Sequence, residues 1–156
     1  MTKDDRYRRG VGVMLLNRVG KVFVGARIDN TDEAWQMPQG GIDKGEDSWP
    51  AALRELEEET GIPPRLVERV AECPERLKYD LPEELRSKLW GGKWKGQDQD
   101  WYLTRFLGTD ADVNIATAHP EFREWKWIEP QQLPELIVPF KRDLYRSLLS
   151  EFAAYL

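Results

Sequence analysis

The sequence predicts a single α/β domain, and three observations support this prediction. The chain has 156 residues, which is a usual length for one domain and enough to bury a substantial core. Short apolar runs typical of strands alternate with two segments that have helical features. Seven Trp, five Tyr and five Phe supply large apolar side chains, although 33% of the residues are charged. We therefore expect one compact domain over residues 1–156 that mixes strands with helices.

Strands are predicted where branched and aromatic residues cluster between turn signals. The first two such runs are separated by the turn sequence of residues 17–20, so they are expected to form a hairpin. The predicted strands are Val11–Leu16, Lys21–Arg27, Trp35–Met37, Leu66–Cys73, Trp101–Leu107 and Trp125–Ile128. Residues 28–34 are polar and predicted to be a loop, and residues 82–96 are predicted to hold a short helix and a mobile loop.

The clearest predicted helix spans Ser48–Thr60. Asp47 or Ser48 is a suitable N-cap, Pro50 fits the first turn, and Gly61 is a suitable terminator. A second helix is predicted within residues 139–156, where Leu144, Leu148 and Phe152 recur at helical spacing.

Composition limits the possible partners. The net charge of −5 argues against a bulk nucleic-acid binder such as a DNA-coating protein, but not against an enzyme that binds one end of a nucleic acid. A single cysteine, Cys73, allows no internal disulfide and favours the cytoplasm. No apolar run approaches the roughly 20 residues of a membrane span, and the first residues lack a signal-peptide pattern. We expect no membrane partner.

The first predicted helix carries a concentrated acidic face. Glu55, Glu58 and Glu59 are three and four residues apart and therefore share one side of the helix. The side expected to face the core carries Trp49, Leu53 and Leu56. Such an acidic face is often merely solvated. However, the three carboxylates repel one another, and a divalent cation would relieve this repulsion more than Arg54 alone can. Oxygen ligands without His or Cys suit Mg²⁺ or Mn²⁺, ions that commonly share their shell with substrate phosphates.

The surrounding residues give this helix a recognisable pattern. Segment 40–62 resembles the signature of the Nudix hydrolase family, and every specified position is filled. These positions are Gly40, Glu46, Arg54, Glu55, Leu56, Glu58, Glu59, Gly61 and Ile62. The resemblance implies an α/β/α sandwich with a mixed sheet, and a metal-dependent enzyme that cleaves phosphoanhydride bonds.

Further motifs resemble one branch of this family, the bacterial RNA pyrophosphohydrolases and the related diadenosine polyphosphate hydrolases. They occur in the order expected for that branch over nearly the whole chain. The matching segments are Tyr7–Arg8, Gly10–Val13, Trp35–Gly41, Tyr79–Pro82, Gly96–Gln97 with Gln99 and Trp101, Pro120–Phe122 and Phe140–Asp143. The sequence departs from this pattern at one place. Relatives tend to carry a lysine next to the tryptophan, whereas here Asp98 and Asp100 flank Gln99. The two acidic side chains would weaken the attraction of phosphate unless Lys93 or Lys95 compensates.

The resemblance also implies roles for individual residues. It assigns metal binding to Glu55, Glu58, Glu59 and Glu121, with a backbone carbonyl near Gly40. It assigns catalytic roles to Glu55, Glu121 and Arg54. It implies substrate contacts for Arg8, Arg27, Gln39, Tyr79, Phe140 and Lys141, with Phe140 as a platform on which a base stacks.

The expected reaction is attack of water on phosphorus, assisted by two or more Mg²⁺ or Mn²⁺ ions, with Glu55 or Glu121 as the base. With a 5′-triphosphate RNA end the products are a 5′-monophosphate end and pyrophosphate, a step of mRNA decay. Two alternatives remain open. One is a dinucleoside polyphosphate hydrolase that cleaves diadenosine tetraphosphate to ATP and AMP, and the other is a non-catalytic Nudix-like nucleotide-binding module. The sequence leaves the oligomeric state open.

Overall fold

The computed structural model describes residues 6–29 and 34–156, and its centre is a mixed seven-stranded sheet. The main strand order is β4-β6-β1-β2-β7, with β3 paired to β1 and β5 paired to β6. The strands are β1 (Tyr7–Leu16), β2 (Val22–Arg27), β3 (Gln39–Gly41), β4 (Val67–Glu72), β5 (Leu77–Asp80), β6 (Gly96–Phe106) and β7 (Phe122–Ile128). The central β1–β6 pair is parallel, and its register runs from Tyr7 opposite Gly96 to Leu16 opposite Arg105.

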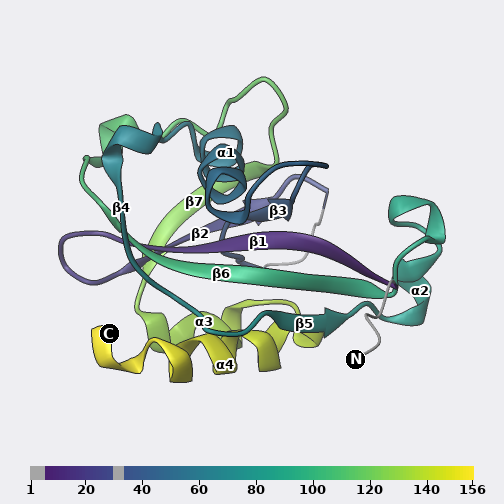
Figure 1. The fold of residues 1–156 in the computed structure, drawn as a ribbon. Coiled ribbons are helices and arrows are strands. Elements are labelled where there is room, and N and C mark those ends of the chain that lie inside the picture. The colour runs from purple at the N-terminus through teal and green to yellow at the C-terminus, as the bar shows by residue number, and fades with distance from the viewer. Residues whose placement is uncertain (1–5, 30–33) are drawn as a thin grey trace.

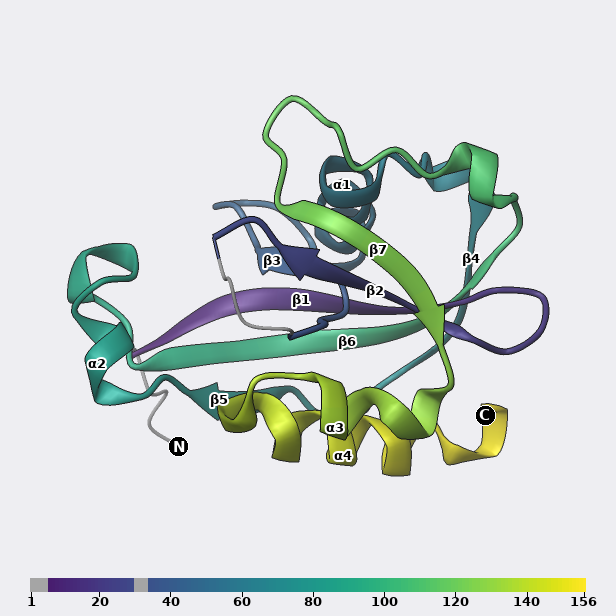
Figure 2. The same ribbon diagram turned by 180° about the vertical axis from the view of Figure 1, so that it is seen from behind.

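Helices cover both faces of this sheet, as Figures 1 and 2 show. On one face lies α1 (Ser48–Thr60), and on the other lie α3 (Leu133–Leu136) and α4 (Arg142–Glu151). The short α2 (Glu83–Arg86) stands at one end of the sheet. The expectation of an α/β/α sandwich with a mixed sheet is confirmed.

The core is divided by the sheet into two layers because strand side chains alternate between faces. Met14 and Trp101 pack toward α4, where they meet Tyr145. Val11, Val13, Leu15 and Phe23 belong to the other layer, together with Leu56 of α1. Burial on both faces explains why β1 appears in the sequence as a continuous apolar run rather than an alternating one.

Helix α1 has the predicted bounds, but its buried face differs from the expected one. Asp47 occupies the N-cap without a side-chain cap hydrogen bond, and Gly61 ends the helix in a left-handed conformation with φ 74°. Leu56 is buried as expected, whereas Trp49 and Leu53 are half-buried. The helix buries the small side chains of Ala51 and Ala52 against the sheet, which allows close approach.

Several boundaries were predicted wrongly. Strands β1 and β6 begin at Tyr7 and Gly96 rather than Val11 and Trp101, because cross-strand hydrogen bonds extend them through polar residues that carry no hydrophobic signal. Segment Trp35–Met37 contributes an isolated bridge between Gln36 and Gly25 instead of a strand. Strands β3 and β5 and helix α3 were not predicted, since residues 38–41 were expected to be a loop, and α4 begins only after a 3-10 turn over Pro139–Lys141. Residues 30–33 of the predicted loop lie outside the described part of the chain.

No helix in the described ranges is both long and apolar enough to cross a bilayer.

We predict that Gly61→Ala destabilises the protein by about 1–3 kcal/mol, measured by denaturant unfolding. The left-handed φ of 74° disfavours alanine, and a Cβ there would lie 2.7 Å from the carbonyl oxygen of Asn114. Gly20 is the matched control, since its φ is 79° but no atom lies within 4 Å of its Cβ position. Gly20→Ala should therefore cost less than Gly61→Ala; equal losses would contradict a role for the Asn114 contact.

Candidate active site on helix α1 and strand β3

The candidate site is organised around two glycines of strand β3. This strand pairs antiparallel with β1, placing Gly40 opposite Val11. A Cβ on Gly40 would overlap the Glu55 carboxyl group, and a Cβ on Gly41 would overlap the Arg8 guanidinium. A Cβ at either position would force the facing side chain to move, because the backbone of β3 passes directly against a carboxylate and a guanidinium.

Arg54 holds the acidic residues of this region in place. Its guanidinium donates from Nε and Nη2 to the two oxygens of Glu46, each at 2.8 Å, and from Nη2 to the Gly41 carbonyl at 2.9 Å. Nη1 donates to Glu55 at 2.9 Å and to Glu58 at 3.2 Å. The arginine thus links the loop before α1 to two glutamates of the helix, and its expected catalytic role stays a prediction.

Two carboxylates of the site are withdrawn from water. Glu59 is only 4% exposed and accepts a hydrogen bond from the backbone N–H of Gln39 at 3.1 Å. Burial raises the pKa of Glu59 well above its usual value, and the negative charges of Glu55 and Glu121 raise it further. Burial also raises the pKa of Glu55, although Arg54 opposes this shift. Three acidic side chains from two regions of the chain therefore influence one another electrostatically.

The three glutamates of the acidic face differ in their surroundings. The Glu58 side chain is 55% exposed and bonded to Arg54, whereas that of Glu55 is 16% exposed and Glu59 is buried. Within the described residues, no three His, Cys, Asp or Glu side chains are placed to hold a metal ion together. For Glu58 to join the other two at one ion, its side chain has to leave Arg54.

The residues nevertheless fit a divalent cation in their chemistry. Glu55, Glu59 and Glu121 offer oxygen ligands only, which suit a hard ion. A buried carboxylate whose pKa is raised by two neighbouring carboxylates is stabilised when a cation takes the place of a proton.

The carboxylate outside the helix, Glu121, is held close to the site by Arg27. Arg27 donates two hydrogen bonds of 2.7 Å to Asp29 and lies 3.5 Å from the Glu121 carboxylate. The pairing of β2 with β7 places Arg27 opposite Phe122, and the Ile28 amide donates to the Glu121 carbonyl at 2.9 Å. The structure thus brings together Arg27 and Glu121, which are far apart in the sequence.

A buried network of glutamines lies beside the acidic residues. Gln39 and Tyr79 were expected to contact substrate, but no role was predicted for Gln97 and Gln99. Tyr79 Oη accepts from Gln97 at 2.8 Å and from Gln39 at 3.4 Å. Gln99 donates to the Gln39 side chain at 3.3 Å and accepts from Trp101 Nε1 at 2.9 Å. Gln97, Gln99 and Trp101 alternate along β6 and so share one face, and this period-2 pattern was the available signal.

Aromatic and cationic side chains lie near this network. The Phe140 ring centroid is 6.0 Å from that of Tyr79, and Lys141 Nζ is 5.0 Å from the Tyr79 centroid. Lys141 is buried, and burial lowers its pKa to about 7, with Arg27 adding to the effect. Its charge is therefore easily lost, and a bound anion would restore it.

The two aspartates that depart from the family pattern are paired with arginines. Asp100 lies 3.2 Å from Arg9, and Asp98 lies 3.5 Å from Arg76. The strand register places Asp98 opposite Arg9 and Asp100 opposite Val11, so the Arg9–Asp100 pair runs diagonally between β1 and β6. These ion pairs partly neutralise both aspartates, and compensation by Lys93 or Lys95 stays a prediction.

Comparisons with known proteins agree with this fold and site. The NUDIX domain model matches residues 6–148. An RNA pyrophosphohydrolase of Erythrobacter litoralis is 59% identical over 152 residues, covering 96% of this chain and 93% of its own. One from Dinoroseobacter shibae is 53% identical over 160 residues and covers both chains fully. The chain therefore belongs to the Nudix family.

Solved structures support the same fold. A C. elegans Ap4A hydrolase superposes with a TM-score of 0.67 at 23% identity, covering 95% of this chain and 99% of its own. The E. coli dihydroneopterin triphosphate pyrophosphohydrolase gives a TM-score of 0.72 at 18% identity, covering 92% and 97%. Both are too distant in sequence to indicate more than the fold.

We predict that Glu46→Gln lowers stability in a pH-dependent way. The hydrogen bonds from Arg54, together with the Asp43 amide, lower the pKa of Glu46 to about 2 from 4.5. Because the folded-state pKa is depressed, the stabilisation is present above pH 4.5 and is lost as the pH falls toward 2. The difference in melting temperature between wild type and variant should be constant near neutral pH and narrow below pH 4.5. Glu68→Gln, which breaks an exposed pair with Arg105, is the control and should have little effect.

We also predict that Gly40→Ala lowers kcat by about 100-fold or more while the protein stays folded. The added methyl would displace the Glu55 carboxylate. Because this carboxylate is the flexible end of a side chain, the fold can tolerate the shift, but the carboxylate leaves the position that catalysis needs. Initial rates and circular dichroism measure the two effects. Normal kcat in a folded variant would show that the position of Glu55 is unimportant.

Proposed function

We propose that this protein is an RNA 5′-pyrophosphohydrolase, which converts a 5′-triphosphate end to a 5′-monophosphate end and releases pyrophosphate. The observation that carries the proposal is identity of 53–60% to several RNA pyrophosphohydrolases over nearly the full length of both chains. The complete Nudix signature argues against a non-catalytic module, since all its carboxylates are present. We assign the reaction to the cytoplasm, where it would begin the decay of mRNA.

We further propose roles for the residues of the site. Glu55, Glu59 and Glu121 hold Mg²⁺ or Mn²⁺, more than one ion being bound, and Glu58 and the Gly40 carbonyl supply further oxygens. When bound, the ions neutralise phosphate charge and acidify water. Arg8, Arg27 and Lys141 bind the phosphates. Phe140 stacks on a base of the RNA. Gln39 and Tyr79, which belong to the buried network, also contact the substrate.

In the proposed chemical step, a water oxygen bonds to phosphorus as the phosphoanhydride bond between the α- and β-phosphates breaks. Glu55 is the preferred base, because burial has raised its pKa and a hydrogen bond of 2.9 Å from Arg54 fixes the orientation of its carboxylate. Glu121, held by Arg27, is the other candidate base. Pyrophosphate leaves, and the RNA retains its α-phosphate.

The function is tested by assaying 5′-triphosphate RNA and diadenosine tetraphosphate side by side with Mg²⁺. We expect release of pyrophosphate from RNA at the higher kcat/KM, and loss of activity when EDTA removes the metal. A higher kcat/KM for diadenosine tetraphosphate would instead make the protein a dinucleoside polyphosphate hydrolase.

Glu55→Gln should cut kcat by about 10³-fold or more, because the amide neither accepts the proton nor binds the cation as well. The melting temperature without metal should be similar or higher, since a partly buried charge is removed. Glu57→Gln, on the exposed side of the same helix, is the control and should retain full activity. Comparable kcat in the Glu55 and Glu57 variants would remove Glu55 from the reaction.

A further inference from the structure

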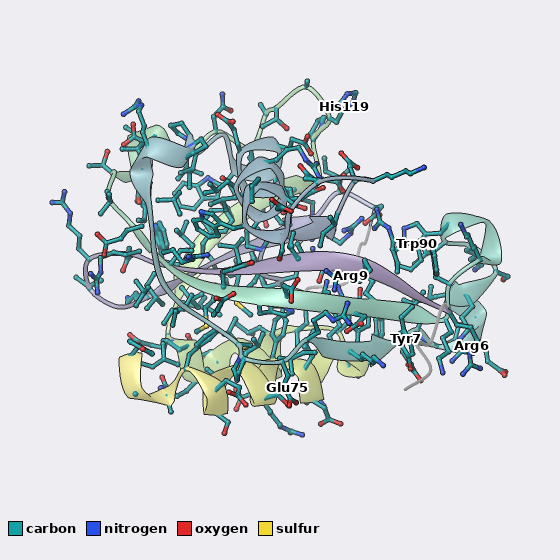
Figure 3. All side chains as sticks on the ribbon, viewed as in Figure 1. Arg6, Tyr7, Arg9, Glu75, Trp90 and His119 are labelled. Atoms are coloured by element: carbon teal, nitrogen blue, oxygen red, sulfur yellow. The ribbon has the colours of Figure 1, made fainter. Side chains whose placement is uncertain are left out.

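Beyond the catalytic region, one end of the sheet gathers basic and aromatic side chains from separate segments. We call it the basic aromatic surface and define it as Tyr7, Lys78, Trp90, Lys93, Trp94 and Lys95. The start of β1, the end of β5 and the start of β6 meet there: Tyr7 pairs with Gly96, and Asp80 pairs with Gly96 from the other side. Figure 3 shows Tyr7 and Trp90 at this end of the molecule, beside α2.

Cations lie over each of its aromatic rings. Lys78 Nζ and Lys95 Nζ are 4.9 and 4.7 Å from the Tyr7 ring centroid. Lys93 Nζ is 4.6 Å from the Trp94 centroid, and the Arg8 guanidinium is 5.2 Å from the Trp90 centroid. Rings flanked by cations offer stacking for bases and charge for phosphates within the same few ångströms.

The backbone at Trp90 is unusual. Its φ is 51°, and it is the one non-glycine residue with positive φ in the described part of the chain. Gly91 and Gly92 follow with φ of 65° and 77°. A bulky residue is disfavoured in this conformation, and such strain concentrates at functional positions. Trp90 begins the 3-10 turn Trp90–Gly92, and its half-buried indole packs against the core and lies under the Arg8 guanidinium.

The charge of this end is opposite to that of the whole protein. Residues 6–9 and 76–95 contain nine Lys and Arg but three Asp and Glu, in a chain whose net charge is −5. Arg9 and Arg76 are paired with Asp100 and Asp98, so the positive excess of this end comes from the other cations. One of the three acids, Asp80, accepts a hydrogen bond from Tyr7 Oη at 2.5 Å and so fixes the ring between the two lysines. A local excess of positive charge on an acidic protein indicates a polyanionic partner.

Arg8 connects this surface to the candidate active site. It stacks on Trp90 and also lies against Gly41, next to the Gly40–Glu55 contact. Arg8 therefore lies between the Gly40–Glu55 contact and the Trp90 ring, and an RNA strand whose 5′ end is at Glu55 would reach the basic aromatic surface by passing Arg8. Neither the base platform at Phe140 nor the phosphate-binding residues proposed above belong to this surface.

We propose that the basic aromatic surface binds the single-stranded RNA downstream of the 5′-terminal nucleotides, with bases on Trp90 and Trp94 and phosphates on Lys78, Lys93 and Lys95. This inference rests on the proposed RNA substrate. It explains how an acidic protein holds a long RNA while its catalytic region holds only the end.

The test compares two substrates with the same first two nucleotides: a 5′-triphosphate dinucleotide and an unstructured 5′-triphosphate RNA of about ten nucleotides. The Lys93→Glu/Lys95→Glu variant should lose about tenfold in kcat/KM on the longer RNA and less than about twofold on the dinucleotide. For the longer RNA, the slope of log KM against the logarithm of the salt concentration should decrease by about 1.4, which corresponds to about 0.7 for each lost phosphate contact. Arg18→Glu/Lys21→Glu, in the hairpin turn at the other end of β1, makes the same change of charge and should alter neither substrate.

A second measurement does not depend on catalysis. Titration with a ten-nucleotide 5′-hydroxyl RNA should quench tryptophan fluorescence, and Trp94→Leu should weaken this binding at least about fivefold. Tyr155→Leu, at an exposed aromatic near the C-terminus, is its control and should bind normally.

The outcomes separate the two proposals. If wild type cleaves neither RNA but binds the 5′-hydroxyl RNA through Trp94, the proposed function fails and the RNA surface stands. If both substrates lose activity equally in the lysine variant, or neither does, the RNA surface is overturned. Unchanged RNA kinetics and binding would also be the result if this end served a protein partner instead.

Discussion

The site depends on the close passage of strand β3 between a carboxylate and a guanidinium. Glycine at positions 40 and 41 leaves room for Glu55 on one residue and Arg8 on the next. A Cβ at either position would displace these side-chain ends from the site. The same contact fixes the loop before α1, because Arg54 reaches back from the helix to the Gly41 carbonyl and to Glu46. The helix, the loop and the strand are therefore one rigid unit.

This unit concentrates charges that are unfavourable without a ligand. Glu59 and Lys141 are both buried, and their pKa values are shifted toward the neutral forms, upward for the acid and downward for the amine. A protein optimised only for stability would replace such groups with apolar side chains. Bound cations and phosphates would stabilise the charged forms of these two groups. The protein without ligand is therefore less stable than it would be with apolar side chains at these positions.

Some helices and strands could be predicted from the sequence and others could not. Helix α1 was predicted with its observed bounds, since its periodicity and its stop at Gly61 are local properties. Strand β5 and the first residues of β1 and β6 were missed or shortened, because their polar residues become strand only through pairing with distant partners. The burial of Glu59 was not predicted either. Helical spacing places it beside Glu55 and Glu58, but the position of β3 decides which glutamate is covered.

By itself, the sequence determined the family pattern, the α/β class and the residue types of the site, because the order and spacing of glycines, carboxylates and apolar residues along one helix are local information. Only the tertiary structure decided that Arg27 meets Glu121, that Arg9 and Arg76 pair with the two unusual aspartates, and that Tyr7, Lys78 and Trp90 share one end of the sheet. These contacts join residues far apart in the chain. Their partners are set by strand register and by packing across the sheet, which no local pattern records.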